Sequence, residues 1–305
     1  MNAQALTPTD RRASSQRWYA IGPVWILVLI MLAVPTIASA YVQSRTQDGE
    51  AVSWVRRCIP FHVNNKGSDD LSLQLVLETI QRSLGTWSDV SCADVEFFYQ
   101  GETDNDFVGF LTDAPNINMV IFRETPSEWL HSKNIIALTT VTFCEEIAGP
   151  CEAVGQIVDA DIELNGAYHR FSATTPVPST RFDLENSVTH ELGHLLGFDH
   201  SFEPDATRYE SAPTGESLKR DLADDDELGL CTVYPAGARS EVCEPFDVDG
   251  PYFPGPGVVA EDIERSATTP SGCMCAADDG AAGLLDGWIM VSLLVYIRRR
   301  WLRSR

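Results

Sequence analysis

The feature that most constrains this chain is the run HELGHLLGFDH, which begins at His190 and ends at His200. In an α-helix each residue turns by about 100°, so His190 and His194 lie on one face, one turn apart. Both imidazoles can then reach the same metal ion. Glu191 lies beside that ion without having to bind it, and its carboxylate can take a proton from a metal-bound water. The spacing therefore predicts a metal centre on a helix.

Two further residues complete this pattern. Gly197 stands where the helix should end, because glycine adopts the left-handed conformation that reverses the chain. Beyond that turn His200 can return as a third ligand, and three neutral imidazoles on zinc leave one position for a water whose pKa falls to about 7. The competing interpretation is that these are ordinary surface or core histidines. The chain has only six histidines and three fall in this run, which favours the metal site.

The remainder of residues 54–236 predicts one α+β domain. Asp69 or Asp70 is expected to cap a helix, and two later helices are expected over 184–196 and 224–233. The helix that begins near Asp69 or Asp70 carries apolar residues at helical spacing: Leu71, Leu75, Ile80 and Leu84. The helix over 184–196 carries an apolar stripe opposite the histidines: Val188, Leu192, Leu195 and Leu196. Runs of β-branched and aromatic residues predict strands over 59–63, 95–99, 119–122, 135–143 and 156–163.

Both ends of the chain resemble addressing signals. Residues 1–40 combine three arginines, an apolar run over 21–37 and the small-residue sequence Ala38-Ser39-Ala40, which predicts a cleaved signal peptide. An uncleaved membrane anchor is the alternative, although the apolar run is short for a span of roughly 20 residues. In either case residues 41–53 form a polar lead-in, and the domain is expected to leave the cytoplasm.

The C-terminal part predicts a linker and an anchor. Residues 237–272 are rich in Pro, Gly and acidic residues, as extended linkers are. In residues 273–305 a Cys-Met-Cys sequence precedes an apolar stretch and an arginine cluster. This order resembles the myxobacterial C-terminal sorting tails, and the resemblance implies a protein held at the cell surface or outer membrane, or released from it. A weak membrane helix alone is the alternative.

The remaining six cysteines predict disulfide bonds, because an even number in an exported chain favours pairing over free thiols. They are Cys58, Cys92, Cys144, Cys151, Cys231 and Cys243. Six cysteines allow 15 pairings, about which sequence says little. Nearness favours Cys144–Cys151, with Cys58–Cys92 and Cys231–Cys243 following by elimination. A structural zinc site is the competing interpretation, but no C-x-x-C pair lies in the domain.

The charge balance excludes one class of partner. The chain has 44 acidic and 22 basic residues, for a net charge of −22. Nucleic-acid binding needs clustered Lys and Arg, so no nucleic-acid partner is expected.

The extended pattern H-E-x-x-H-x-x-G-x-x-H resembles the metzincin clan of zinc peptidases. Ser201, directly after the third histidine, makes the chain resemble the matrixin branch. The resemblance implies a metzincin-like α+β catalytic domain over 54–236, with a twisted mixed β-sheet, an active-site helix and a small C-terminal subdomain. It also implies that His190, His194 and His200 bind Zn²⁺ and that Glu191 is the catalytic base.

Two other segments look like parts of bacterial matrixin-like proteins: GQIVDADIELN over 155–165, and the closing helix from Asp225 to Leu230 with Tyr234-Pro235. Within the segment 155–165, two interpretations of Asp159 and Asp161 are open. They form a solvated loop face, or they bind Ca²⁺ or line the edge of the cleft.

One position departs from the family. Metzincins place a methionine in a tight turn beneath the zinc, and in the matrixin arrangement that residue is Arg208 here. The chain has no methionine between Met119 and Met274. An arginine beneath a dication is unfavourable unless it turns outward or pairs with a carboxylate.

These features predict a zinc-dependent endopeptidase that hydrolyses peptide bonds of extracellular proteins, with Glu191 assisting attack by zinc-bound water. Two alternatives stay open. One is a zinc-stabilised surface binding module with weak or no turnover, which Arg208 motivates. The other is a zinc hydrolase of a non-peptide amide.

Overall fold

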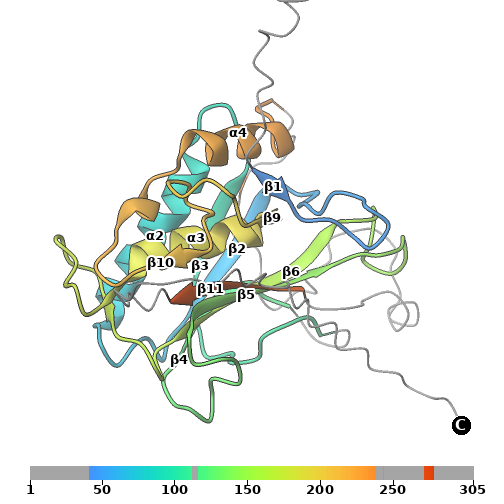
Figure 1. Ribbon diagram of the computed structural model, residues 1–305. Coiled ribbons are helices and arrows are strands. Elements are labelled where there is room, and N and C mark those ends of the chain that lie inside the picture. The colour runs from blue at the N-terminus through green and yellow to red at the C-terminus, as the bar shows by residue number, and fades with distance from the viewer. Residues whose placement is uncertain (1–40, 112–115, 238–242, 244–270, 278–305) are drawn as a thin grey trace, which may run out of the picture. The chain divides into compact units, whose positions relative to one another are not determined.

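The computed structural model describes residues 41–111, 116–237, 243 and 271–277. They form a mixed α+β fold around one seven-stranded sheet, as the sequence predicts. In Figure 1 the helices α2 and α3 lie together on one side of this sheet. One apolar core joins the sheet to both helices, so the face of the sheet that carries α3 is also the face that positions the predicted metal centre.

The large sheet has the strand order β10-β11-β5-β6-β4-β2-β3. The strands β2, β3, β4 and β6 run parallel to one another, β5 runs antiparallel to β6, and β11 runs antiparallel to β5. Its strands are β2 (Cys58–Asn64), β3 (Glu96–Thr103), β4 (Met119–Arg123), β5 (Ile135–Phe143), β6 (Ile157–Asn165), β10 (Ser211–Ala212) and β11 (Ser271–Ala277). Two small pairs complete the strands: β1 (Val42–Gln43) with β9 (Phe198–Asp199), and β7 (Phe171–Ser172) with β8 (Phe182–Asp183).

In the described residues three α-helices and one 3₁₀ turn accompany the sheet: α2 (Leu73–Ser88), α3 (Leu184–Leu195), η1 (Leu218–Arg220) and α4 (Asp224–Val233). The predicted cap of α2 is wrong. Ser72 caps it by accepting from the Leu75 N–H at 3.4 Å. The carboxylate of Asp70 instead accepts from the Phe171 N–H at 2.9 Å and pairs with Arg181 at 3.2 Å.

The helix α3 is buried all round. The four predicted apolar residues of its stripe, Val188, Leu192, Leu195 and Leu196, are each 0% exposed. Two tryptophans also hold its backbone: the indole of Trp87 donates to Thr189 O, and that of Trp54 donates to Leu195 O, each at 2.8 Å. Because a buried indole N–H needs a partner, both rings fix the position of α3 as well as filling the core.

The described part of the chain contains three disulfide bonds, and two of them correct the sequence prediction. Cys144–Cys151 is confirmed. The others are Cys58–Cys243 and Cys92–Cys231, which join residues 185 and 139 positions apart, so the pairings Cys58–Cys92 and Cys231–Cys243 are wrong. The physical reason is the fold: Cys231 lies in α4, next to the loop that leads into β3, as the bridge between Ala93 and Pro235 shows.

The predicted ends fall mostly outside the described residues. The signal peptide (1–40) lies outside them, as does the tail 273–305 except for 273–277. In the described ranges we find no helix with the length and apolar character needed to span a bilayer. The strand β11 crosses the predicted border between linker and tail, and the sequence pattern did not predict it.

The turn that ends α3 depends on Gly197, as predicted. Its φ is +88°, in the left-handed region, and its N–H donates to His194 O at 2.9 Å. A Cβ atom at this position would also collide with the carbonyl oxygen of Val52. The residue therefore needs both the backbone freedom and the small size of glycine.

We predict that Gly197→Ala lowers the free energy of unfolding by more than Gly49→Ala does. Gly49 has a similar φ of +92°, but a Cβ there meets nothing within 4 Å. The Gly49 variant thus measures backbone strain alone, about 1 kcal/mol or somewhat more, and the Gly197 variant adds the collision. Urea denaturation measures both. Equal losses would show that close approach to Val52 does not constrain the turn.

Candidate metal centre

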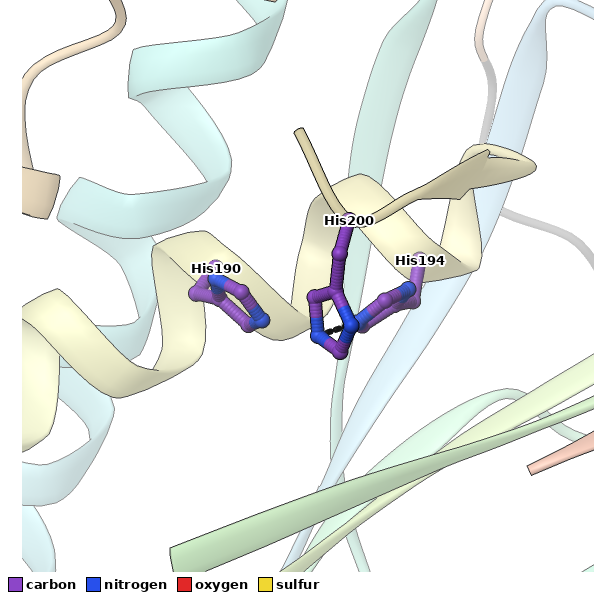
Figure 2. Close-up of side chains that lie close together, drawn as sticks. All are labelled: His190, His194 and His200. Atoms are coloured by element: carbon purple, nitrogen blue, oxygen red, sulfur yellow. Dashed lines mark hydrogen bonds between the residues drawn. The ribbon is translucent and has the colours of Figure 1, made fainter. Parts of the chain in front are cut away.

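Three imidazoles meet at the C-terminal half of α3. His190 and His194 project from one face of the helix, and His200 returns from the segment after β9, so that the three rings point toward one another (Figure 2). One nitrogen from each ring lies within 4.8 Å of the other two. The Nε2 atoms of His194 and His200 are 3.2 Å apart. The structure thus brings together the three residues that the sequence predicts as ligands.

A backbone carbonyl lies against Nδ1 of each of the two helical histidines. Nδ1 of His190 lies 2.6 Å from Thr207 O, and Nδ1 of His194 lies 2.8 Å from Phe198 O. A carbonyl only accepts, so Nδ1 of His190 carries the proton and its Nε2 keeps the lone pair. Nδ1 of His194 also contacts the Arg208 guanidinium. Nε2 of His190 is buried and has no hydrogen-bond partner among the described residues. A buried lone pair without a donor suits a metal ion.

The ionisation of the site agrees with this arrangement. Burial, followed by the charge of Arg208, lowers the pKa of His190 and of His194 well below the usual value for histidine. The same two causes lower the pKa of the half-buried His200 to about 3. All three rings are therefore neutral at physiological pH. Three neutral imidazoles, two of them oriented by backbone carbonyls, are a donor set that fits Zn²⁺.

The carboxylate of Glu191 is fixed by the neighbouring strand. Its Oε2 lies 2.6 Å from the hydroxyl of Thr139 in β5, and the same hydroxyl lies 3.1 Å from Glu191 O. Both residues are 0% exposed. Sequence reasoning missed Thr139, because a threonine within an apolar strand carries no motif. Only the packing of β5 against α3 identifies it.

Arg208 does not turn outward, which is one of the two favourable positions considered from sequence. It is 2% exposed and lies beneath the histidines rather than turned outward. Its guanidinium donates to His190 O and, at 2.8 Å, to Phe198 O, and one nitrogen lies 2.9 Å from Nε2 of His194. Room for the side chain comes from Gly193, where a Cβ would collide with Arg208 Cδ.

A carboxylate also lies near Arg208, and it binds the backbone of the same loop. Asp226 in α4 accepts from the N–H of Thr207 at 2.7 Å and from that of Arg208 at 3.2 Å. Ser201, whose hydroxyl donates to Asp225 at 2.8 Å, fixes the other end of the same loop. Acids at the start of α4 therefore hold the loop that carries Arg208 and the carbonyl that orients His190.

Asp159 and Asp161 in β6 are buried, each 1% exposed, so the interpretation as a solvated loop face is wrong. Asp161 accepts from the N–H groups of Gly109 at 2.7 Å and Met119 at 3.1 Å. Oδ2 of Asp159 has no hydrogen-bond partner in the described part of the chain. Within those same ranges, the histidine trio is the only group of three or more His, Cys, Asp or Glu residues close enough to share an ion. Calcium binding by these aspartates stays a prediction.

Burial raises the pKa of Asp159 to about 7, so folding favours its protonated form. In the unfolded chain the pKa is about 3.9. The wild type should therefore lose stability, relative to Asp159→Asn, as pH rises from about 4 to about 7. Urea denaturation of both proteins across this range, with chelator present, measures the difference. A difference that stays constant with pH would contradict a protonated Asp159 in the fold.

Comparison with known proteins agrees with this geometry. Residues 127–235 match the matrixin family model. This segment contains β5, β6, α3, α4 and all three histidines.

Similar proteins include metalloendoproteinase 2-MMP of Arabidopsis thaliana, 26% identical over 165 residues, which are 53% of this chain and 37% of that protein. Metalloendoproteinase 1 of Glycine max is 45% identical over 60 residues, 20% of this chain and 19% of that protein. Matrilysin of Homo sapiens is 41% identical over 54 residues, 18% of this chain and 20% of that protein. The matches span well under half the length of these relatives, and they support the resemblance to matrixin-like metzincins.

Proposed function

We propose that this chain is a zinc-dependent endopeptidase that hydrolyses peptide bonds in protein or peptide substrates. The observation that carries the proposal is the convergence of His190, His194 and His200, with the carboxylate of Glu191 beside them on the same helix. The family match and the metalloendoproteinase names of the similar proteins support it.

In this proposal His190, His194 and His200 hold the ion. Bound zinc supplies an acidified water and a Lewis acid for the substrate carbonyl. Glu191 accepts the proton of the attacking water at a carboxylate oxygen and passes it to the nitrogen of the leaving amine. The Thr139 hydroxyl holds Oε2 of Glu191 in place during this transfer. The complete burial of Glu191 keeps bulk water away from the carboxylate.

The proposed location is outside the cytoplasm, with the C-terminal tail holding the protein at a membrane. Only the patterns of residues 1–40 and 273–305 support this location. An extracellular protein or peptide is then the proposed substrate.

We predict that Glu191→Gln lowers kcat for casein hydrolysis by about 10²- to 10⁴-fold, because the general base is lost. Zinc content should stay at one ion per chain, since Glu191 is not a ligand. A matched control is Glu185→Gln, which removes a carboxylate at the other end of α3 that pairs with Arg82 at 2.9 Å. This control should keep wild-type kcat, and a chelator should abolish hydrolysis by the wild type. Full activity of Glu191→Gln, or of the chelated protein, would refute the mechanism.

Arg208 favours a second candidate function, a zinc-stabilised binding module with weak turnover. Its guanidinium lies 2.9 Å from Nε2 of His194, the atom that would bind zinc. Two positive unit charges about 4 Å apart repel by roughly 4 kcal/mol at an effective dielectric constant of 20, and the zinc ion carries two such charges. A buried arginine in this position therefore weakens zinc binding unless the guanidinium moves.

The variants Arg208→Met and Arg208→Lys separate charge from shape. If the guanidinium charge weakens the site, Arg208→Met should bind zinc at least tenfold more tightly than the wild type, whereas Arg208→Lys, which keeps the charge, should not. Competition with a chromophoric chelator measures the affinities. Wild-type affinity in both variants would remove the observation that favours a binding module.

A further inference from the structure

The proposed metal site does not explain why the strand β11 joins the sheet. Residues Ser271–Ala277 lie between two other strands, antiparallel to β5 on one side and parallel to β10 on the other. Figure 1 shows β11 alongside β5, and in the strand order of the sheet β11 lies between β5 and β10. The segment that contributes this strand is distant in sequence from the rest of the domain, so its position needs a separate explanation.

The register places β11 at the level of the candidate catalytic carboxylate. Cys273 is the partner of Thr139, and the Thr139 hydroxyl holds Glu191. Cα atoms of β11 also lie within 8 Å of Cα atoms of α3, the helix that carries two of the three histidines. An extended segment therefore runs past the metal centre at the position of its general base.

The second partner of β11 also belongs to the site. Ser211 pairs with Ala276, and Ala212 pairs with Ala277. These β10 residues closely follow the loop in which Thr207 orients His190 and Arg208 lies beneath the ligands. The backbones of β5 and β10 thus flank one strand position, called the groove below, in which an extended segment pairs with both. Main-chain hydrogen bonds bind such a segment with little dependence on its sequence.

The groove admits one strand at a time. The strand β5 has two edges, and β6 occupies one of them along residues Ala137–Phe143. The other edge is the one that pairs with β11. A substrate peptide that added to β5 would have to use that same edge, since each edge offers one row of backbone donors and acceptors. Residues 271–277 and an added peptide strand therefore exclude each other.

We propose that residues 271–277 occupy the peptide-binding groove beside the metal centre and inhibit the chain by excluding peptide ligands, an inference that rests on the proposed function for its biological meaning. The occupant belongs to the same chain, so its pairing is intramolecular and is governed by an effective concentration rather than by the concentration of free peptide. Weak intrinsic pairing is then sufficient to keep the groove filled. Displacement or removal of the C-terminal segment opens it.

The test uses the full chain carrying Glu191→Gln, which binds without turning over. Into it we introduce Met274→Pro, or Cys275→Pro as a second variant, because proline removes a backbone N–H and disrupts strand pairing. The control is Ala267→Pro, which lies outside β11. The probe is a fluorescein-labelled peptide with the sequence of 271–277, carrying serine in place of both cysteines so that no thiol binds zinc. Fluorescence anisotropy measures its affinity.

Both β11 variants should bind the probe at least tenfold more tightly than the parent chain, and the control should bind like the parent. Their β5 amides should also exchange hydrogen faster. Equal probe affinity in all four proteins would overturn the inference.

Casein hydrolysis, measured separately with Glu191 restored, distinguishes the two proposals. Tighter probe binding without hydrolysis by any variant refutes the peptidase and leaves the inference standing, whereas equal hydrolysis and equal affinity refute the inference alone.

Discussion

The burial of α3 is the constraint on which the rest of this structure depends. A helix that carries two histidines and a glutamate is enclosed on all sides, and each of these three polar residues is at most 1% exposed. Such burial is favourable only if the polar atoms are satisfied by partners. The indoles of Trp54 and Trp87, the carbonyls of Thr207 and Phe198, and the Thr139 hydroxyl supply those partners. The two carbonyls orient the helical imidazoles, while burial and the charge of Arg208 keep these rings neutral.

The loop after α3 depends on this enclosure in turn. Gly197 reverses the chain in a space too small for a Cβ, and His200 follows three residues later. The loop then closes through bonds from its backbone to Asp226 in α4. The Cys92–Cys231 disulfide fastens α4 to the segment before β3, far from the histidines in sequence. Segments distant in sequence thereby fix the orientation of one ring, that of His190.

Local periodicity allowed much of this to be predicted from sequence. The helical spacing of His190 and His194, the turn at Gly197 and the limits of β5 and α4 follow from short-range rules. The features that were predicted wrongly, or not predicted at all, depend on contacts between segments distant in sequence. Nearness in sequence favoured Cys58–Cys92, whereas the fold places Cys58 beside Cys243. Neither the direction of the Arg208 side chain, nor the role of Thr139, nor the addition of β11 to the sheet leaves a periodic signal.

We propose that three imidazole nitrogens bind one zinc ion above a buried arginine. Zinc-edge X-ray absorption of the purified full chain tests it most directly. We expect a nearest shell of light atoms only, three nitrogens and one oxygen, at about 2.0–2.1 Å. A sulfur neighbour at about 2.3 Å, or a protein that takes up no zinc at all, would contradict it.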